Sequence, residues 1–358
     1  MSAKKFIISG GGTGGHIYPA IAIANALKED NPDHEILFIG AKGKMEMEKV
    51  PKAGFKIIGL WISGFQRSLT IKNLLFPIKL IFSLLRTAGI IIKYKPDVVI
   101  GVGGFASGPT LRMADWLGYP IMIQEQNSFP GMTNRILAPK TKRICVAYPG
   151  LEKFFSSDKL RLTGNPVRKD ILNLEGKKEE AIHHFNLNSE KRTLLIVGGS
   201  LGARSINLGV QKYLNEITGM GIQVIWQTGK SFDKIEGLPE EVKMMTFIER
   251  MDLAYAAADF VISRAGALAV SEIALVKIPS ILVPYPHASE NHQFKNAEAL
   301  VKGEAAILLE DNKVDEDLLS SLTSIVENND LANKLRENIQ SFGFPNSANE
   351  IAQEVLSI

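Results

Sequence analysis

Apolar and polar positions divide the first half of the chain into short apolar runs, most of them followed by a segment with helical spacing. Five runs have the length of buried strands and are rich in branched residues; they lie at residues 4–9, 35–40, 97–102, 120–123 and 144–147. Short runs without polar alternation are typical of parallel strands that are covered on both faces. The alternation with helical segments therefore predicts a doubly wound α/β sheet.

The pattern restarts after residue 163, and the second half repeats the plan of the first. Apolar runs at residues 193–197, 223–229, 242–248, 260–263 and 280–287 again alternate with helical segments. A single core usually stops growing near ~250–300 residues, and this chain has 358. We therefore expect two similar domains that face a cleft, with the boundary near residue 163.

Three of the predicted strands end in glycine-rich segments, at residues 10–16, 101–109 and 198–204. Glycine lets the backbone bring its N–H groups close to a ligand. The helix that follows each segment adds unpaired amides and the positive end of its dipole. Because loops at the carboxyl ends of parallel strands form the ligand crevice, these segments predict sites for a phosphate or another anion.

The first glycine segment leaves two other interpretations open. Gly10, Gly12 and Gly15 match the G-x-G-x-x-G pattern of dinucleotide sites, but the second strand ends in Gly40-Ala41-Lys42, without the usual ribose-binding acidic residue. A turn that only packs the helix on the strand is the other interpretation. Neither explains His16, because an imidazole beside backbone donors is suited to accept a proton.

Polar side chains after other predicted strands are candidate ligand contacts. Ser200 adds a hydroxyl where the helix after the third glycine segment begins. Glu272 lies within a predicted helix, and its carboxylate can accept two hydrogen bonds from a ribose diol. Arg168 can reach a diphosphate, although an isolated arginine is also typical of a surface. For residues 124–127, ligand binding and a purely local network both stay open.

The charge distribution is uneven. Residues 49–96 contain no acidic and nine basic residues, so the rest of the chain holds 41 − 9 = 32 basic residues against 38 acidic ones. Four bases recur at intervals of seven residues: Lys72, Lys79, Arg86 and Lys93. On one helix this spacing gives a narrow basic stripe. The apolar positions between these bases include Leu75, Phe82 and Leu85.

Two interpretations of this cationic segment stay open. The first is a crossover helix that buries its apolar residues against the sheet and leaves its bases in water. The second is a helix whose apolar edge lies in an anionic membrane interface, where apolar burial and charge attraction add.

Composition narrows the classes of protein to which this chain can belong. Hydrophobic residues make up 45% of the chain and charged residues 22%, as in ordinary globular proteins. We expect no signal peptide and, without a run of ~18 uncharged apolar residues, no membrane-spanning helix. The single cysteine, Cys145, excludes an intrachain disulfide and a cysteine-built metal site, and it fits a reducing compartment. The only D-x-D pattern, residues 315–317, lies at a predicted helix start, so we expect no metal and no cofactor.

Seven motifs, in order over nearly the full length, resemble those of the peptidoglycan N-acetylglucosaminyltransferases of the MurG type, which are inverting enzymes with the two-Rossmann (GT-B) fold. The motifs are Gly-Gly-Thr-Gly-Gly-His (11–16), Gly-Gly-Phe-Ala-Ser-Gly-Pro (103–109), Glu-Gln-Asn (125–127), Gly-Asn-Pro-Val-Arg (164–168), Gly-Gly-Ser-Leu-Gly-Ala-Arg (198–204), Ser-Arg-Ala-Gly-Ala-Leu-Ala-Val-Ser-Glu (263–272) and His-Gln-Phe-Lys-Asn-Ala (292–297).

The resemblance implies transfer of GlcNAc from UDP-GlcNAc to the C4 hydroxyl of MurNAc in undecaprenyl-diphosphate-MurNAc-peptide, which converts lipid I to lipid II. The implied partners are UDP-GlcNAc, the lipid I acceptor, an anionic membrane surface and other cell-wall synthesis proteins, with no nucleic acid. The implied location is peripheral, on the cytoplasmic face of the inner membrane. A UDP-GlcNAc 2-epimerase, another glycolipid transferase and a non-catalytic nucleotide-sugar-binding protein stay open as alternatives.

The resemblance also implies where each substrate binds. It assigns the acceptor and the membrane to residues 1–163 plus 343–358, and UDP-GlcNAc to residues 164–342. His16 matches the general base. The implied substrate-binding residues are Thr13, Gly14, Gly15, Asn127, Arg168, Ser200, Ile248, Ala267, Leu268, Ala269, Val270, Ser271, Glu272 and Gln293. The candidate acceptor or membrane contacts are Gly103, Gly104 and Glu125, from these motifs, and Lys72, Leu75, Lys79, Phe82 and Arg86, from the cationic segment.

Within the donor site, the resemblance implies that the backbone of Ile248 contacts uracil, that Glu272 holds the ribose, and that Ser200 and Arg168 hold the diphosphate. The sequence departs from the family pattern at two positions. Gln124 stands where histidine is frequent, and Leu201 where glutamine is common. We therefore expect no proton transfer at position 124 and no essential phosphate contact from the Leu201 side chain.

Overall fold

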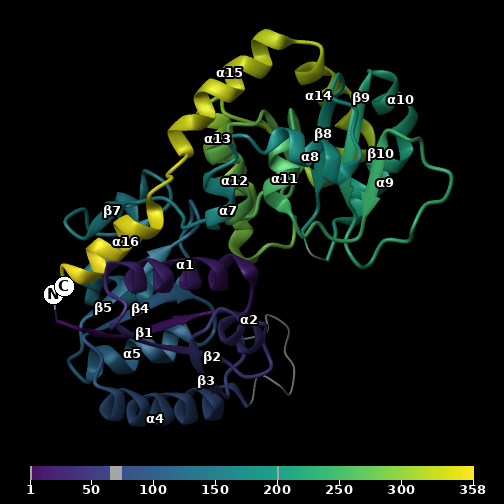
Figure 1. Ribbon diagram of the computed structural model, residues 1–358. Coiled ribbons are helices and arrows are strands. Elements are labelled where there is room, and N and C mark those ends of the chain that lie inside the picture. Colours follow the sequence, from purple (N-terminus) through teal and green to yellow (C-terminus); the bar gives the residue numbers. More distant parts are fainter. Residues whose placement is uncertain (1, 65–74, 200) are drawn as a thin grey trace. The chain divides into compact units, whose positions relative to one another are not determined.

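The computed structural model describes residues 2–64, 75–199 and 201–358, and the chain forms two compact units (Figure 1). The N-terminal unit consists of Met1–Val167 together with Asn346–Ile358, and the C-terminal unit of Arg168–Pro345. Each unit has its own parallel sheet and its own hydrophobic core. The predicted fold class, two Rossmann-like doubly wound parallel-sheet domains, is confirmed.

In the described residues, the N-terminal sheet has seven strands in the order β3-β2-β1-β4-β5-β6-β7, and all of its pairs are parallel. The strands are β1 (Lys5–Gly10), β2 (Glu35–Ala41), β3 (Lys56–Leu60), β4 (Val98–Gly103), β5 (Ile121–Glu125), β6 (Arg143–Val146) and β7 (Leu160–Leu162). The edge strands β3 and β7 were not predicted. Both are short and only partly apolar, so the periodicity signal over them is weak.

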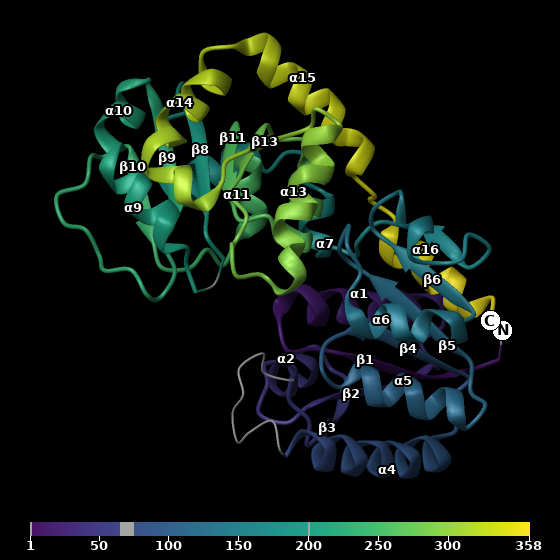
Figure 2. The same ribbon diagram turned by 180° about the vertical axis from the view of Figure 1, so that it is seen from behind.

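Helices cover both faces of this sheet (Figures 1 and 2). One face carries α1 (Gly14–Asp30) and α16 (Ser347–Leu356), which pack against each other. The other face carries α4 (Phe76–Tyr94) and α5 (Ser107–Trp116), which also pack together. The shorter helices are α2 (Glu46–Lys52) and α6 (Met132–Leu137). Because α16 places Ile351, Ala352 and Val355 in the core beside α1, the end of the chain completes the N-terminal unit.

The C-terminal sheet of the described residues has six parallel strands in the order β10-β9-β8-β11-β12-β13. They are β8 (Arg192–Val197), β9 (Ile222–Gln227), β10 (Val242–Met245), β11 (Phe260–Ser263), β12 (Ser280–Leu282) and β13 (Ile307–Leu308). The helices are α7 (Lys169–Leu172), α8 (Lys178–Phe185), α9 (Arg204–Lys212), α10 (Leu214–Gly219), α11 (Met251–Ala257), α12 (Ala267–Val276), α13 (His292–Lys302), α14 (Val314–Val326) and α15 (Asn329–Ile339).

Two strands of the C-terminal unit are shorter than predicted. The run at 242–248 ends at Met245, because the next amides bond outside the ladder; the N–H of Ile248, for example, donates to Gln227 Oε1. The run at 280–287 ends at Leu282, since Pro284 and Pro286 have no N–H to continue a ladder. The two-residue strand β13 is too short to give a pattern and was not predicted.

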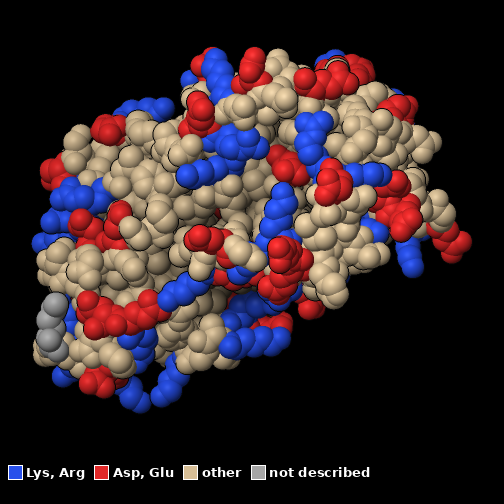
Figure 3. All heavy atoms as spheres, turned by 45° about the horizontal axis from the view of Figure 1, so that its top comes forward, with Lys and Arg blue, Asp and Glu red and all other residues tan. Residues whose placement is uncertain are grey.

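The surface carries charges of both signs. Lys and Arg side chains alternate with Asp and Glu over the face shown in Figure 3, in keeping with a net charge of only +3. Within the described ranges, no helix has the length and apolarity that a bilayer crossing requires. The acidic residues at 315–317 lie in the first turn of α14, and no group of His, Cys, Asp and Glu in the described chain is arranged to hold a metal ion.

Candidate active site

The first glycine segment contacts the second at the carboxyl ends of two neighbouring strands. Strand β1 pairs with β4, and beyond this pair the N–H of Gly11 donates to the carbonyl of Gly103 at 3.2 Å. Gly12 and Gly104 have φ of +84° and +92°, in the left-handed region that favours glycine. A Cβ at Gly104 would overlap the carbonyl oxygen of Gly11. Glycine at these positions therefore lets two loops meet backbone to backbone.

The imidazole of His16, the third residue of α1, is held through Nδ1. This atom lies 3.1 Å from the carbonyl oxygen of Gly11 and 3.1 Å from Thr13 Oγ1. A carbonyl oxygen only accepts, so the first contact requires a proton on Nδ1, and the neutral ring then carries its lone pair on Nε2. A Cβ at Gly103 would lie 2.9 Å from Nε2, so the glycine makes room for the ring. The arrangement suits His16 to take a proton at Nε2.

The beginning of α1 is arranged for an anion. Thr13 is the N-cap residue, with an extended backbone and no side-chain cap, and the first turn contains no acidic residue. Gly14 and Gly15, both partly exposed, therefore present N–H groups that precede every helical acceptor. A phosphate or carboxylate placed there would meet both these donors and the positive end of the helix dipole.

Glu125, at the end of β5, holds the loop that carries Asn127. Its Oε1 accepts from the N–H and the side-chain amide of Asn127, at 3.0 and 3.2 Å. Its Oε2 accepts from the N–H of Gly131 and from Asn134 Nδ2, at 3.1 and 2.7 Å. Burial raises the pKa of Glu125, although these bonds act in the opposite direction. The carboxylate is 2% exposed, so its direct role is to fix this loop.

Gln124 is part of a buried amide network. Its side chain is fully buried, and Nε2 donates to Asn165 Oδ1 at 3.0 Å. Asn165 in turn donates to the carbonyl of Gln126 at 3.0 Å. The network ties the end of β5 to the loop that follows β7.

In the C-terminal unit, the partly exposed Arg168 and the buried Tyr255 and Glu272 form a polar cluster. Arg168 Nε lies 3.3 Å from Glu272 Oε1, and the hydroxyl of Tyr255 donates to Glu272 Oε2 at 3.2 Å. Burial raises the pKa of Glu272, and the Arg168 charge opposes that effect. Burial and the adjacent carboxylate raise the pKa of Tyr255 well above its usual value, so its hydroxyl stays a donor.

Tyr255 was not among the predicted site residues. It lies on α11 between small residues and is 4% exposed. A tyrosine that is this deeply buried usually has a hydrogen-bond partner for its hydroxyl, but its burial is known only from the structure, so the sequence offered no signal for this residue. The partner itself, Glu272 on α12, is decided by the packing of the two helices and not by the local sequence.

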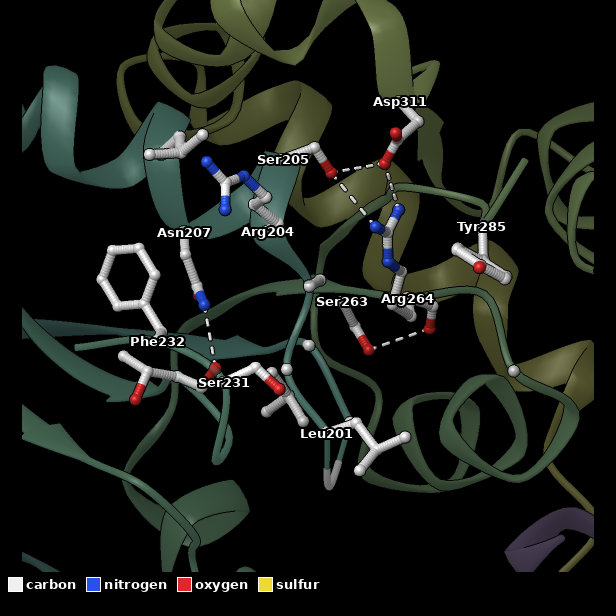
Figure 4. A pocket seen from close by; sticks show the side chains of 18 of the residues that line it. Leu201, Arg204, Ser205, Asn207, Ser231, Phe232, Ser263, Arg264, Tyr285 and Asp311 are labelled. Atoms are coloured by element: carbon white, nitrogen blue, oxygen red, sulfur yellow. Dashed lines mark hydrogen bonds and ion pairs between the residues drawn. The ribbon is translucent and has the colours of Figure 1, made fainter. Parts of the chain in front are cut away.

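The third glycine segment borders a cavity of about 1290 Å³ in the C-terminal unit (Figure 4). Gly202 has φ of +85°, and a Cβ there would overlap the carbonyl oxygen of Thr228 on the next loop. Leu201 is 73% exposed and lines the cavity together with Ala269 and Gln293. Ser200 lies outside the described residues.

Arg264 ties the walls of this cavity together (Figure 4). Its guanidinium pairs with Asp311, donates to Ser205 Oγ at 3.1 Å and donates to the carbonyl of Val283 at 3.2 Å. The same group lies over the Tyr285 ring, 5.6 Å from its centroid. These contacts join the start of α9 to the loop after β12. Arg264 was not predicted as a site residue.

The other predicted residues lie nearby in the C-terminal unit. Helix α12 begins at Ala267, with Gly266 as its extended N-cap, and carries Leu268, Val270 and Ser271 in its first turns. Gln293 Oε1 accepts from the N–H of Tyr285 at 2.9 Å, which turns its amide nitrogen away from that loop. Since the N–H of Ile248 is engaged with Gln227, its carbonyl is the backbone group that it offers to a ligand.

A parallel sheet with anion-binding loops at its carboxyl edge, present twice in one chain, is the architecture of two-domain nucleotide-sugar transferases. The family model described as "Glycosyltransferase family 28 N-terminal domain" matches residues 6–146, and the one described as "Glycosyltransferase family 28 C-terminal domain" matches residues 193–354. The chain belongs to glycosyltransferase family 28.

Two relatives align over almost the whole chain. Proteins of Flavobacterium psychrophilum and Cytophaga hutchinsonii, both named UDP-N-acetylglucosamine–N-acetylmuramyl-(pentapeptide) pyrophosphoryl-undecaprenol N-acetylglucosamine transferase, are 50% and 49% identical. The alignments cover 100% and 99% of this chain and 98% and 96% of the relatives. The crystal structure of Acinetobacter baumannii MurG superimposes with a TM-score of 0.79 at 26% identity, covering 99% of this chain and 100% of that one.

Gly199 and Gly202 of the third glycine segment give a prediction about stability. Gly202→Ala should lower the free energy of unfolding by about 1–3 kcal/mol more than Gly199→Ala, measured by urea unfolding. Both positions have φ near +85°, so the conformational strain is matched, but a Cβ at Gly199 meets open space whereas one at Gly202 meets backbone atoms. Equal losses in the two variants would show that the loop contact at Gly202 contributes nothing.

Proposed function

We propose that this protein transfers N-acetylglucosamine from UDP-GlcNAc to the C4 hydroxyl of the MurNAc sugar in an undecaprenyl-diphosphate-linked peptide, with inversion at the transferred carbon. Relatives that are about half identical over their full length carry this acceptor and this transferred group in their names. The feature of the molecule that supports the proposal most directly is the contact from His16 Nδ1 to the Gly11 carbonyl, because it leaves a lone pair on Nε2.

The acceptor half of the reaction uses the N-terminal unit. The C4 hydroxyl attacks C1 of GlcNAc, the bond from C1 to the UDP oxygen breaks, and the hydroxyl proton passes to His16 Nε2. An imidazole suits this transfer because it titrates near neutral pH. We assign the diphosphate of the acceptor to the N–H groups of Gly14 and Gly15, because they lie in the first turn of α1, where amides have no helical acceptor.

The donor half uses the C-terminal unit. Glu272 accepts hydrogen bonds from the ribose hydroxyls, and its second oxygen stays fixed by Tyr255. Negative charge builds on UDP as it leaves, and Arg168, with the amides at the start of α9, stabilises that charge. We assign a diphosphate contact to the Ser200 hydroxyl and sugar contacts to Ala267, Leu268 and Gln293.

The role of His16 predicts a separation of turnover from donor binding. His16→Ala should cut kcat by about 10²–10⁴, the usual contribution of a general base, while UDP-GlcNAc binding measured by calorimetry stays unchanged. His183→Ala, which removes an exposed histidine from α8, is the matched control. Near-normal turnover in His16→Ala would remove this residue from the role of base.

The assay for that comparison also tests the reaction itself. Labelled UDP-GlcNAc is incubated with a lipid I analogue, and labelled disaccharide lipid is the expected product. Formation of UDP-ManNAc would instead indicate an epimerase, and binding without any product would indicate a non-catalytic protein.

The Tyr255 hydroxyl gives a prediction for the donor site. Tyr255→Phe should weaken UDP-GlcNAc binding about twofold to tenfold, the typical net contribution of one hydrogen bond, because Glu272 Oε2 loses its fixed donor. Tyr213→Phe is the control, since that hydroxyl donates to the carbonyl of Asp315 at an exposed position. Calorimetric affinities that are equal for Tyr255→Phe and the wild type would contradict this role.

We further propose that α4 binds the anionic cytoplasmic surface of the inner membrane. Its buried residues are Ser83, Thr87 and Ile91, so two of its three buried side chains carry hydroxyls. The apolar residues Leu75, Phe82 and Leu85 are 43%, 52% and 67% exposed. These exposures disagree with the interpretation in which the segment buries its apolar residues against the sheet.

Basic residues accompany the exposed apolar side chains. Lys79 Nζ lies over the Trp61 ring, 5.7 Å from its centroid, and Arg86 is exposed on the same helix. Lys72 lies outside the described residues. Apolar insertion combined with charge attraction is how interfacial helices bind anionic bilayers.

The membrane proposal predicts that combined replacement of Leu75, Phe82 and Leu85 by serine weakens binding to vesicles of anionic phospholipid by about 10²-fold, if each side chain contributes about 1 kcal/mol. The thermal unfolding midpoint should not fall, because these side chains are already exposed. Val301→Ser, an exposed apolar site in the C-terminal unit, is the control. Undiminished sedimentation of the triple variant with vesicles would reject the proposal.

A further inference from the structure

A buried carboxylate beneath the first glycine segment is used by no step described so far. Glu46 is the first residue of α2 and is 1% exposed. Its Oε2 accepts from the N–H of Gly12 at 2.8 Å, and its Oε1 accepts from the N–H of Ala41, at the end of β2, at 2.9 Å. Both oxygens thus accept from backbone N–H groups. No lysine or arginine of the described chain forms an ion pair with it.

The backbone around Glu46 is shaped to admit this side chain. A Cβ at Gly11 would overlap the carboxylate, and a Cβ at Gly40 would lie 2.6 Å from Glu46 Cγ. Two glycines on separate segments therefore leave the space that the side chain fills. Burying a carboxylate is costly unless its hydrogen bonds are made, so its presence at this point of the fold calls for a function that a neutral residue would not supply.

The two hydrogen bonds place the carboxylate one peptide group away from the imidazole. The peptide that joins Gly11 to Gly12 offers its N–H to Glu46 and its carbonyl oxygen to His16 Nδ1. A peptide that donates to an anion is polarised, so its carbonyl becomes a stronger acceptor. The stronger acceptor favours the proton on Nδ1 of the ring.

We propose that Glu46 is a positioning residue for the base: through the Gly11–Gly12 peptide it holds the His16 imidazole in the tautomer that carries the lone pair on Nε2. The inference rests on the proposed role of His16. The arrangement corresponds to the carboxylate–imidazole pair of hydrolytic triads, in which a carboxylate fixes the tautomer and orientation of the histidine, with one peptide group inserted between the two side chains.

The test uses Glu46→Gln in the full-length protein. Glutamine keeps one oxygen that can accept from the N–H of Gly12 or of Ala41, but its NH2 group then faces the N–H of the other residue. The variant therefore loses one hydrogen bond and the negative charge. We expect kcat to fall about tenfold to hundredfold, the range for removing a group that orients a metal-bound histidine, with KM for UDP-GlcNAc within about twofold of the wild type. Glu48→Gln, on the same helix but exposed and paired with Lys52, should leave both constants unchanged.

A spectroscopic readout separates positioning from a general loss of structure. In protein labelled with ¹⁵N-histidine, with the His16 signals assigned by their loss in His16→Ala, the wild-type ring should show the Nδ1–H tautomer. Glu46→Gln should raise the Nε2–H population. If the glutamine variant does not fold, Glu46→Asp serves for the same comparison, because aspartate keeps the charge but is one methylene shorter. This variant should also lower kcat and raise the Nε2–H population.

The outcomes distinguish this inference from the proposed role of His16. In a His16→Ala background, Glu46→Gln should cause no additional loss of kcat, because both residues act through the same ring. An equal loss in both backgrounds, or a wild-type tautomer together with wild-type kcat in Glu46→Gln, would overturn the inference. If His16→Ala alone kept its turnover, the base assignment would fail, while the tautomer measurement would still decide whether Glu46 controls the ring.

Discussion

The backbone of the first glycine segment is the constraint on which the acceptor half of the molecule depends. Where β1 ends, its N–H and carbonyl groups lose their ladder partners and must find others. Gly11 bonds to Gly103 on the neighbouring loop, Gly12 to the buried carboxylate of Glu46, and the Gly11 carbonyl to His16. The bonds that satisfy the backbone are therefore the same bonds that orient the imidazole. The amides left over, at the start of α1, are those that an anion can use.

Among the buried carboxylates of the described residues, Glu46, Glu125 and Glu272 organise polar groups around proposed site residues. Glu46 accepts from two backbone amides, Glu125 from two backbone and two side-chain amides, and Glu272 from an arginine and a tyrosine. The first two are enclosed by neutral donors, so they serve as fixed acceptors for loops. Glu272 differs because a guanidinium and a phenol hold it from two sides, and its proposed ligand brings further hydroxyl donors.

The two units stabilise comparable loops by different means. In the N-terminal unit, a glycine contact and a carboxylate fix the loop after β1. In the C-terminal unit, Gly202 passes against the loop at Thr228, and Arg264 joins Ser205, Asp311 and the backbone after β12. An arginine with several donors can bind three segments at once, which suits a cavity wall made from separate pieces of chain. The outer helix α4 differs from these buried elements, since two of its three buried residues carry hydroxyls and several of its large apolar residues, such as Ile81, Phe82 and Leu85, are exposed.

The sequence by itself determined the fold class and most strands, because continuous apolar runs that alternate with helical spacing leave few other architectures. It also identified the glycine loops and, through the family resemblance, His16 and Glu272 as candidate site residues. Only the tertiary structure decided which apolar residues of α4 are exposed and which, like Ile91, are buried, since the helical periodicity does not say which face meets the sheet. It likewise decided that Tyr255 meets Glu272 and that Glu46 lies one peptide from His16. These pairs join residues on different elements, and such contacts arise from packing, which leaves no local pattern in the sequence.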